Sequence, residues 1–425
     1  MKYDYDSYMF YEYSKNFRFT ARIRVRLKDN VDGKILENAA VKAFKRFPYF
    51  SKKITVDEEG GYILQDNDKP IVVAKETAEP VVLGGDEANR HFFLISYEGR
   101  DIFFSFSHCF CGGFGVMFWI KTTLWQYLSD KTGKTFDTEG IKIPGSPLEE
   151  GETALPDLCA FPDDEPITEY KGGNSYVPIG EYLGYYLNPF SGDATYFPIE
   201  IDLKKLMSYA KSNDGSPNSI VSAFMFKALR KVWANNKKAT EISARISMNY
   251  NADVGCPNTY RDLVRQLHVK YKNEMLDWPI SKISTVTRAG MFLQMEPEVS
   301  FKEYKTVIEH REKIDMQKTN KEKRKYASDN SLLRKGIADS YTISYTGKID
   351  WGAMGDFIES IYNITDGHLM LELNAIQDKL FLNFQQVNKK RIYLDAFIEE
   401  LRTEGIEVKI GEMQYKKLPL LKLLQ

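Results

Sequence analysis

The stretch from Arg100 to Tyr127 constrains the fold most, because it changes from a strand pattern to a helix pattern within a few residues. Asp101–Ser107 alternates aromatic or apolar residues with others after a Glu-Gly turn, which is typical of a half-buried strand. Apolar residues then recur every three or four positions, which predicts a helix. The elbow between the two, residues 108–113, reads His-Cys-Phe-Cys-Gly-Gly. A histidine fixed by a strand end, beside glycines that permit close approach, makes this elbow a candidate active site.

Length and composition limit the class of protein. The chain has 425 residues, which is long for one core and favours two lobes. Its 58 Lys and Arg residues nearly balance 59 Asp and Glu residues, which argues against a nucleic-acid-binding or anionic-membrane surface. Four cysteines do not form a disulfide framework, and we find no signal-peptide pattern and no bilayer-length apolar run. We therefore expect a cytoplasmic protein without a membrane span, and a monomer.

The chain repeats one order of elements. Residues 1–140 are predicted to contain a strand, a helix capped by Asp32, several short strands, a hairpin and the elbow helix. Residues 141–192 contain seven prolines and no sustained period, which predicts a crossover linker. Residues 193–425 restart with a strand and a helix. We predict an α/β fold with mixed sheets (α+β), in which residues 1–140 and 193–425 each form a lobe.

A strand, a hairpin and a helix are predicted in the second half. Ser340–Gly347 alternates as a strand, and Leu369–Ala375 pairs with Lys379–Gln386 as a hairpin. Phe301–Lys321 has apolar residues at helical spacing and is predicted to be one amphipathic helix.

The elbow resembles the active-site motif of the CoA-dependent acyltransferase superfamily, His-x-x-x-Asp-Gly, here His108 followed by Gly112 and Gly113. That superfamily includes chloramphenicol acetyltransferase, alcohol acetyltransferases and the condensation domains of peptide synthetases. The segments LKDNVDGKILENAAVKAFKRFPYF and SYTISYTGKIDWG are most similar to bacterial alcohol acetyltransferase-like proteins. The resemblance implies two chloramphenicol-acetyltransferase-like lobes, with a tunnel between them that reaches the histidine.

The resemblance also implies roles for individual residues. His108 is the expected general base, because a neutral hydroxyl needs its proton removed as it attacks a thioester. Ser344 matches the family's Ser-Asn-x-Gly position, which here reads Ser-Tyr-Thr-Gly and ends at Gly347, and is the expected oxyanion donor. No bound cofactor is implied. The co-substrate is an acyl-CoA, or a thioester on an acyl-carrier protein, and the acceptor is a small molecule.

Two positions depart from the family pattern. Gly112 stands where the motif has an aspartate, and Asn251 is aligned with the arginine that pairs with that aspartate. Losing both members of a buried ion pair is close to neutral in stability, whereas losing one is costly. The departures are therefore compatible with an active enzyme and equally with a homologue that no longer catalyses.

One basic run and two cysteines remain to be interpreted. Lys323, Arg324 and Lys325 suit a CoA phosphate or a carrier protein's phosphopantetheine, although a solvated helix end is the commoner reason for such a run. Cys109 and Cys111 lack a second ligand pair at zinc spacing, so we predict no metal site and treat both as small elbow residues.

Three functions remain open on the sequence. The first is an acyltransferase that uses acyl-CoA and an alcohol or amine acceptor. The second is a carrier-protein-dependent condensation-type enzyme with the same residues. The third is a degenerate homologue that binds ligands without catalysis, which a blocked cleft at His108 would favour.

Overall fold

The structure, a computed structural model, describes residues 7–14, 18–157, 175–178, 181, 194–332 and 339–423. Most of the predicted linker 141–192 lies outside these residues. The first half contains α1 (Tyr8–Glu12), β1 (Thr20–Leu27), α2 (Gly33–Phe44), β2 (Lys53–Val56), β3 (Tyr62–Gln65), β4 (Val73–Lys75), β5 (Phe93–Glu98), β6 (Asp101–Ser107) and α3 (Gly113–Thr132). The second half contains β7 (Thr195–Asp202), α5 (Leu203–Ser212), α6 (Pro217–Val232), β8 (Glu241–Asn249), β9 (Val264–Lys272), α7 (Ile280–Gln294), α8 (Pro297–Asp315), α9 (Asn320–Asp329), β10 (Tyr341–Lys348), β11 (Ile358–Ile364), β12 (Leu369–Ile376), β13 (Lys379–Gln386), α10 (Ile392–Thr403), β14 (Val408–Ile410) and β15 (Gln414–Tyr415).

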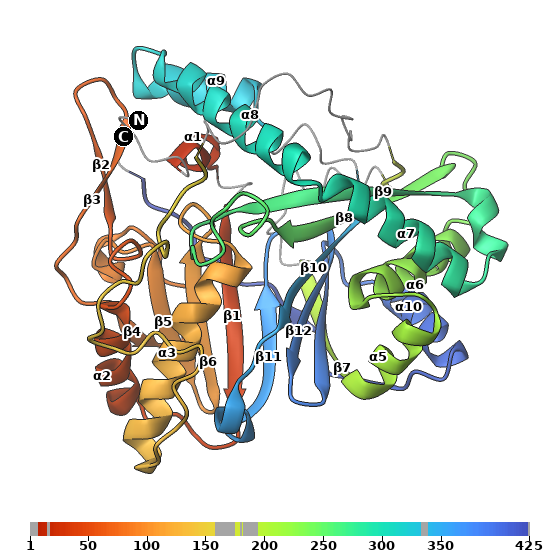
Figure 1. Ribbon diagram of the computed structural model, residues 1–425, viewed down its shortest axis with the longest axis horizontal. Coiled ribbons are helices and arrows are strands. Elements are labelled where there is room, and N and C mark those ends of the chain that lie inside the picture. The colour runs from red at the N-terminus through yellow and green to blue at the C-terminus, as the bar shows by residue number, and fades with distance from the viewer. Residues whose placement is uncertain are drawn as a thin grey trace.

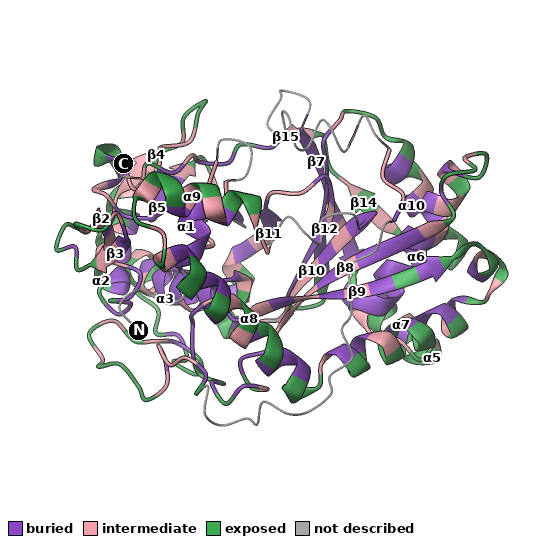
Figure 2. Cartoon of the chain, turned by 90° about the horizontal axis from the view of Figure 1, so that it is seen from above, coloured by how far each residue is buried: buried purple, intermediate pink, exposed green. Residues whose placement is uncertain are grey.

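Two sheets form the two lobes, and they stand beside each other in Figure 1. The first has the strand order β11-β1-β6-β5-β4, and α2 and α3 pack together against it. The second has the order β14-β7-β13-β12-β10-β8-β9, with β15 added beside β7. Helices α6 and α10 pack together over this second sheet, whose strand β12 is almost entirely buried (Figure 2). The α/β class with mixed sheets and two lobes is confirmed.

The predicted strand–elbow–helix unit is present. β6 ends at Ser107 and α3 begins at Gly113, as the two periodicities required. The Asp32 side chain caps α2 by accepting hydrogen bonds from the backbone amides of Lys34 and Ile35. The hairpin of β12 and β13 and the strand β10 are also confirmed.

The single helix predicted over Phe301–Lys321 is wrong. The chain forms α8, which ends at Asp315, and a separate helix α9, which begins after Thr319. Thr319 accepts a hydrogen bond from the backbone of Glu322, and the Glu322 side chain accepts one from the backbone of Thr319. This capping box starts a new helix and explains the break. No helix among the described residues combines the length and apolar character needed to cross a bilayer.

One strand of the first sheet comes from the second half of the chain. β11 pairs antiparallel with β1, with Ile364 opposite Arg22, and it forms the edge of the first sheet that faces the second lobe in Figure 1. Near the C-terminus, Leu421 forms a bridge with Leu83. Residues 193–425 therefore contribute to both lobes, and the domain limits at 140 and 192 remain a prediction about where the repeat restarts.

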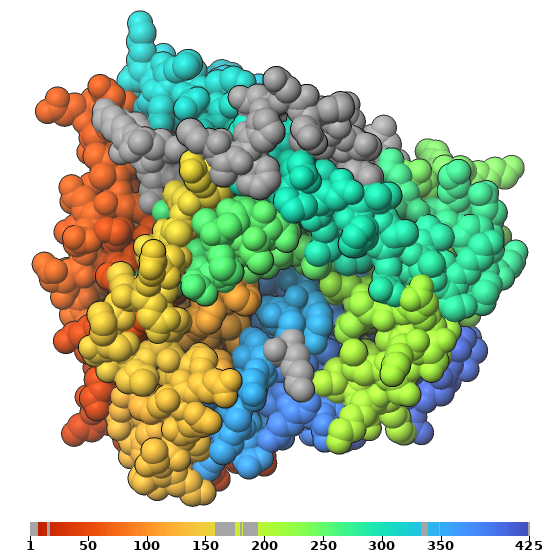
Figure 3. All heavy atoms as spheres, in the orientation of Figure 1, coloured from red at the N-terminus to blue at the C-terminus, as the bar shows by residue number. Residues whose placement is uncertain are grey.

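The loop between β8 and β9 contacts the start of α3. A Cβ atom on Gly115 would lie 2.0 Å from the backbone oxygen of Tyr260 and 2.8 Å from its carbonyl carbon. Figure 3 shows this green segment of the second half packed against the yellow and orange first lobe. Glycine is required at this position because the two backbones leave no room for a side chain.

We predict that Gly115→Ala destabilises the protein by about 1–3 kcal/mol, because a backbone segment of the other half must shift to admit the methyl group. Urea unfolding followed by circular dichroism measures the change. Gly290→Ala is the matched control, since Gly290 lies in α7 with open space around its Cβ position, and there the change should be neutral or stabilising. Equal stability of Gly115→Ala and the wild type would contradict the described contact.

Candidate active site

A cavity of about 400 Å³ lies where the two lobes meet. Its volume falls in the range of small-molecule sites. The first lobe lines it with the elbow residues His108, Gly112 and Gly113, and the second sheet lines it with Ser344 and Glu372, among others. The cavity therefore brings together residues more than two hundred positions apart in the chain.

His108 is held at the end of β6 and keeps part of its side chain accessible. Its backbone N–H donates to the carbonyl oxygen of Phe19 at 2.8 Å, and its ring lies edge-on to Phe106. Desolvation lowers the pKa of His108 to about 4, although a hydrogen bond with the backbone of Cys111 opposes this shift. The imidazole is therefore neutral at pH 7 and able to accept a proton.

At the two elbow glycines, side chains from the second half of the chain come close to the elbow. A Cβ atom on Gly112 would lie 2.6 Å from Oδ1 of Asp262, and one on Gly113 would lie 3.1 Å from Cγ2 of Thr346. A carboxylate is thus present beside position 112, but it belongs to the β8–β9 loop. Cys109 and Cys111 are buried in the core of the first lobe and form no disulfide.

Ser344 lies on β10 directly opposite Glu372 on β12. Its hydroxyl hydrogen-bonds to the Glu372 carboxylate. Thr365 and Asn363 donate to the same carboxylate, at 2.7 and 3.2 Å. The expected oxyanion donor therefore belongs to a buried polar network.

A second polar group lines the cavity on β8 and β9. His268 on β9 hydrogen-bonds through Nδ1 to Oδ2 of Asp339 at 2.9 Å, and Arg245 on β8 donates to the same oxygen at 3.2 Å. His368 hydrogen-bonds through Nε2 to the backbone oxygen of Ser340, and burial lowers its pKa to about 4. His268 and His368 belong to no motif in the sequence, and the structure places both in the cavity wall.

Sequence reasoning also missed two acidic residues of the cavity wall, Glu372 and Asp366. Burial raises the pKa of Asp366 to about 6, while the charge of Lys416 opposes that shift. A signal was present in the β12–β13 hairpin, where Glu, Asn and Gln alternate with leucine and phenylalanine. Such alternation places polar side chains on one face of the sheet.

The remaining motif residues lie near the cavity without lining it. Gly347 has φ +86°, a left-handed conformation that favours glycine, and it follows the cavity residue Thr346. The Asn251 side chain donates to the backbone oxygen of Thr259 at 2.7 Å and so ties together the β8–β9 loop.

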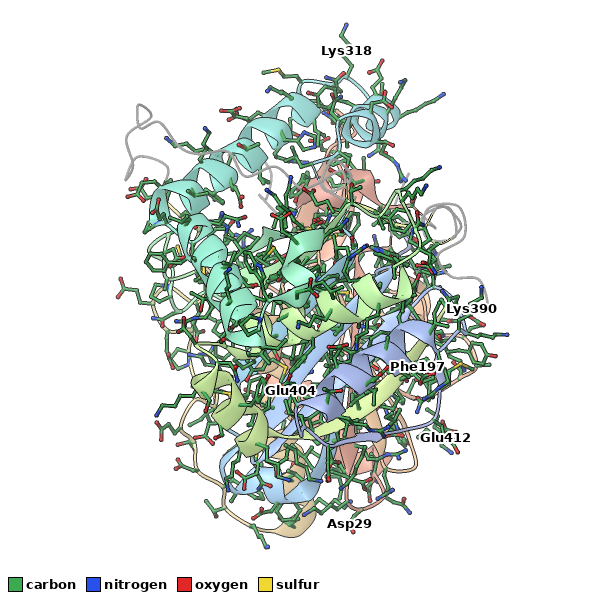
Figure 4. All side chains as sticks on the ribbon, turned by 90° about the vertical axis from the view of Figure 1, so that its right-hand side faces the viewer. Asp29, Phe197, Lys318, Lys390, Glu404 and Glu412 are labelled. Carbon is green, nitrogen blue, oxygen red and sulfur yellow. The ribbon has the colours of Figure 1, made fainter. Side chains whose placement is uncertain are left out.

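The basic run makes contacts within the protein. Lys323 donates to two backbone carbonyls at the α8–α9 turn, Arg324 donates to the backbone oxygen of Tyr13, and Lys325 pairs with an aspartate of its own helix. None of the three lines the cavity, and Figure 4 shows the neighbouring Lys318 at the outer tip of that turn. Their assignment to a donor phosphate stays a prediction.

The chain is similar in overall fold to several solved structures. TRI101 of F. sporotrichioides, complexed with coenzyme A and T-2, has a TM-score of 0.60 and 11% identity over 95% of this chain and 98% of its own. The first condensation domain of the CDA synthetase has a TM-score of 0.52 and 10% identity over 91% and 89%. TRI3, the trichothecene 15-O-acetyltransferase from Fusarium sporotrichioides, has a TM-score of 0.50 and 13% identity over 93% of each chain.

The chain has the fold of the CoA-dependent acyltransferases and condensation domains. No family model and no curated protein matches its sequence. At these identities the likeness establishes the fold, and it agrees with the resemblance inferred from the elbow motif.

We predict that Gly112→Asp, which places the aspartate of the acyltransferase motif in the elbow, destabilises the protein by about 1–3 kcal/mol. The new side chain would meet Asp262, both sterically and as a like charge. The double variant Gly112→Asp with Asp262→Gly should regain at least half of the loss. Equilibrium unfolding of the wild type, both single variants and the double variant measures the coupling, and strictly additive effects would contradict the proximity.

Proposed function

We propose that this protein is an acyltransferase that moves an acyl group from a CoA thioester to an alcohol or amine. The observation that carries the proposal is the shared cavity, which His108 enters from the first lobe and Ser344 from the second. Acyl transfer needs a base beside the nucleophile and a donor beside the thioester oxygen, and no other protein group is obligatory.

In the proposed reaction, His108 removes the proton of the acceptor while the acceptor attacks the thioester carbonyl. Desolvation keeps the ring unprotonated at neutral pH, at the cost of reduced basicity. The protonated imidazole then returns the proton to the departing thiolate of CoA. Each proton is accounted for, and the enzyme forms no covalent intermediate.

Ser344 is the proposed oxyanion donor, and this role requires its hydroxyl to change its hydrogen-bond partner. Its hydroxyl is engaged with Glu372 in the absence of substrate, so it has to rotate toward the carbonyl oxygen as negative charge develops there. Gly347, two positions beyond the cavity residue Tyr345, gives the end of β10 the backbone freedom for a close approach.

A carrier-protein thioester is the alternative donor, favoured by the likeness to a condensation domain. The two donors differ in size but present the same phosphopantetheine thioester. Turnover with acyl-CoA alone supports the first function, and turnover that requires an acylated carrier protein supports the second.

We predict that His108→Ala lowers kcat/KM by roughly 10²- to 10⁴-fold, because the acceptor loses its base. Release of free CoA thiol from acyl-CoA in the presence of an alcohol and amine panel measures the rate. Cys109→Ala is the matched control on the same elbow and should retain activity within a few-fold. Unchanged turnover in His108→Ala, with native circular dichroism, would refute the assigned role.

The pH dependence follows from the pKa of His108, which lies below its ordinary value of 6.5 at about 4. The ring therefore stays neutral as the pH falls through 6.5, and becomes protonated only near pH 4. We predict that kcat/KM with an alcohol acceptor is nearly flat from about pH 5.5 to 7.5, with its acidic limb below pH 5. A profile recorded where the protein remains folded tests this, and an acidic limb near pH 6.5 would be inconsistent with a desolvated base.

A further inference from the structure

Glu372 is a buried acid in the wall of the proposed active site. It lies on β12 with only 2% of its surface exposed, and it lines the same cavity as His108. Desolvation raises the pKa of its carboxyl group, because burial disfavours the charged form.

The groups that contact Glu372 are neutral. Its hydrogen-bond partners are the hydroxyls of Ser344 and Thr365 and the amide of Asn363. No lysine or arginine of the described ranges forms an ion pair with it. A buried carboxylate without a cation is costly, and such a group is usually compensated.

Glu152 shows how this protein compensates a buried acid outside the described cavity wall. Its side chain is 1% exposed and receives two hydrogen bonds from Arg46, at 2.7 and 2.9 Å, and an ion pair from Lys142 at 2.6 Å. These cations lower the pKa of Glu152 despite the burial. Glu372 is equally buried and has donors but no such cation.

The network around Glu372 is oriented to hold a carboxylate. Thr346 donates to Asn374 at 2.5 Å, Asn374 donates to Asn363 at 3.0 Å, and Asn363 donates to Glu372. Gln385 donates to Thr365, whose hydroxyl donates in turn to Glu372. Every step of this network points a hydrogen toward the carboxylate, which favours its ionised form.

The other charges of the cavity wall do not supply the missing cation. Arg245 is paired with Asp339, and Asp366 lies near the charges of Lys416 and Arg18, while Asp262 adds a further carboxyl group. The described wall contains four acidic residues and one arginine, together with three histidines. The space beside Glu372 therefore attracts a positive charge from a ligand.

We propose that the acceptor substrate carries a protonated amine and that Glu372 binds it, while a hydroxyl or second amine of the same molecule faces His108. This inference rests on the proposed function and names the acceptor class: amino alcohols and diamines rather than neutral alcohols or hydroxy acids. Glu372 is a binding residue that fixes specificity, and it takes no part in the proton transfer.

Binding of matched ligands to the wild-type protein tests the proposal without catalysis. Calorimetry compares 6-aminohexan-1-ol, 1,6-hexanediol and 6-hydroxyhexanoate, which differ only in the terminal group. The amino alcohol is expected to bind at least about tenfold more tightly than the diol, and the hydroxy acid most weakly. Equal binding of the amino alcohol and the diol, or tighter binding of the hydroxy acid, overturns the proposal.

Glu372→Gln removes the charge and keeps the shape. It should lose the preference for the amino alcohol, to within about threefold, and bind the diol as the wild type does. Glu359→Gln is the control, because it removes one charge at an exposed ion pair with Arg100 outside the cavity wall, and it should keep the preference. A preference retained in Glu372→Gln overturns the assignment. If this variant does not fold, the wild-type comparison still decides.

Turnover of the same ligands with acetyl-CoA separates this inference from the proposed function. If the diol gives product and the amino alcohol is turned over no faster, the amine specificity is contradicted. The proposed acyl transfer is not contradicted by that result. No thiol release with any acceptor from a broad panel contradicts the proposed function itself.

Discussion

The close approach of the β8–β9 loop to the glycine elbow is the constraint on which the site depends. Gly112 and Gly115 admit Asp262 and the backbone of Tyr260 into space that side chains would otherwise fill. This contact, together with the pairing of β11 with β1, holds the second half of the chain against the first sheet. These contacts hold the lobe that carries His108 against the lobe that carries Ser344.

The same contact explains how the chain tolerates an unusual motif. The acyltransferase motif that the elbow resembles has an aspartate at this position, whereas in this chain the carboxylate of Asp262 in the β8–β9 loop lies beside Gly112. A second carboxylate at position 112 would overlap with the carboxylate of Asp262 and repel it. The presence of Asp262 therefore favours a glycine at position 112. The carboxylate beside the elbow of this chain therefore belongs to the other lobe.

The sequence predicted the elements whose patterns lie within a few neighbouring residues, and it did not predict features that depend on distant residues. The elbow, α2 and the β12–β13 hairpin follow from periodicities within a few residues, and these predictions were confirmed. β11 was missed because its partner β1 lies more than three hundred residues earlier, and no local pattern records that pairing. Glu372 was missed because the alternation of polar and apolar residues in the β12–β13 hairpin indicates a polar face of the sheet without showing what that face lines. Its meaning comes from burial and from the neutral residues that surround it.

The central claim is that the neutral imidazole of His108 lies where a thioester and its acceptor meet. A crystal structure of the protein with bound CoA tests this most directly. The account predicts the terminal thiol of CoA inside the cavity, within contact distance of the His108 ring and facing Ser344. CoA bound elsewhere on the surface, with the cavity left free of it, would contradict the account.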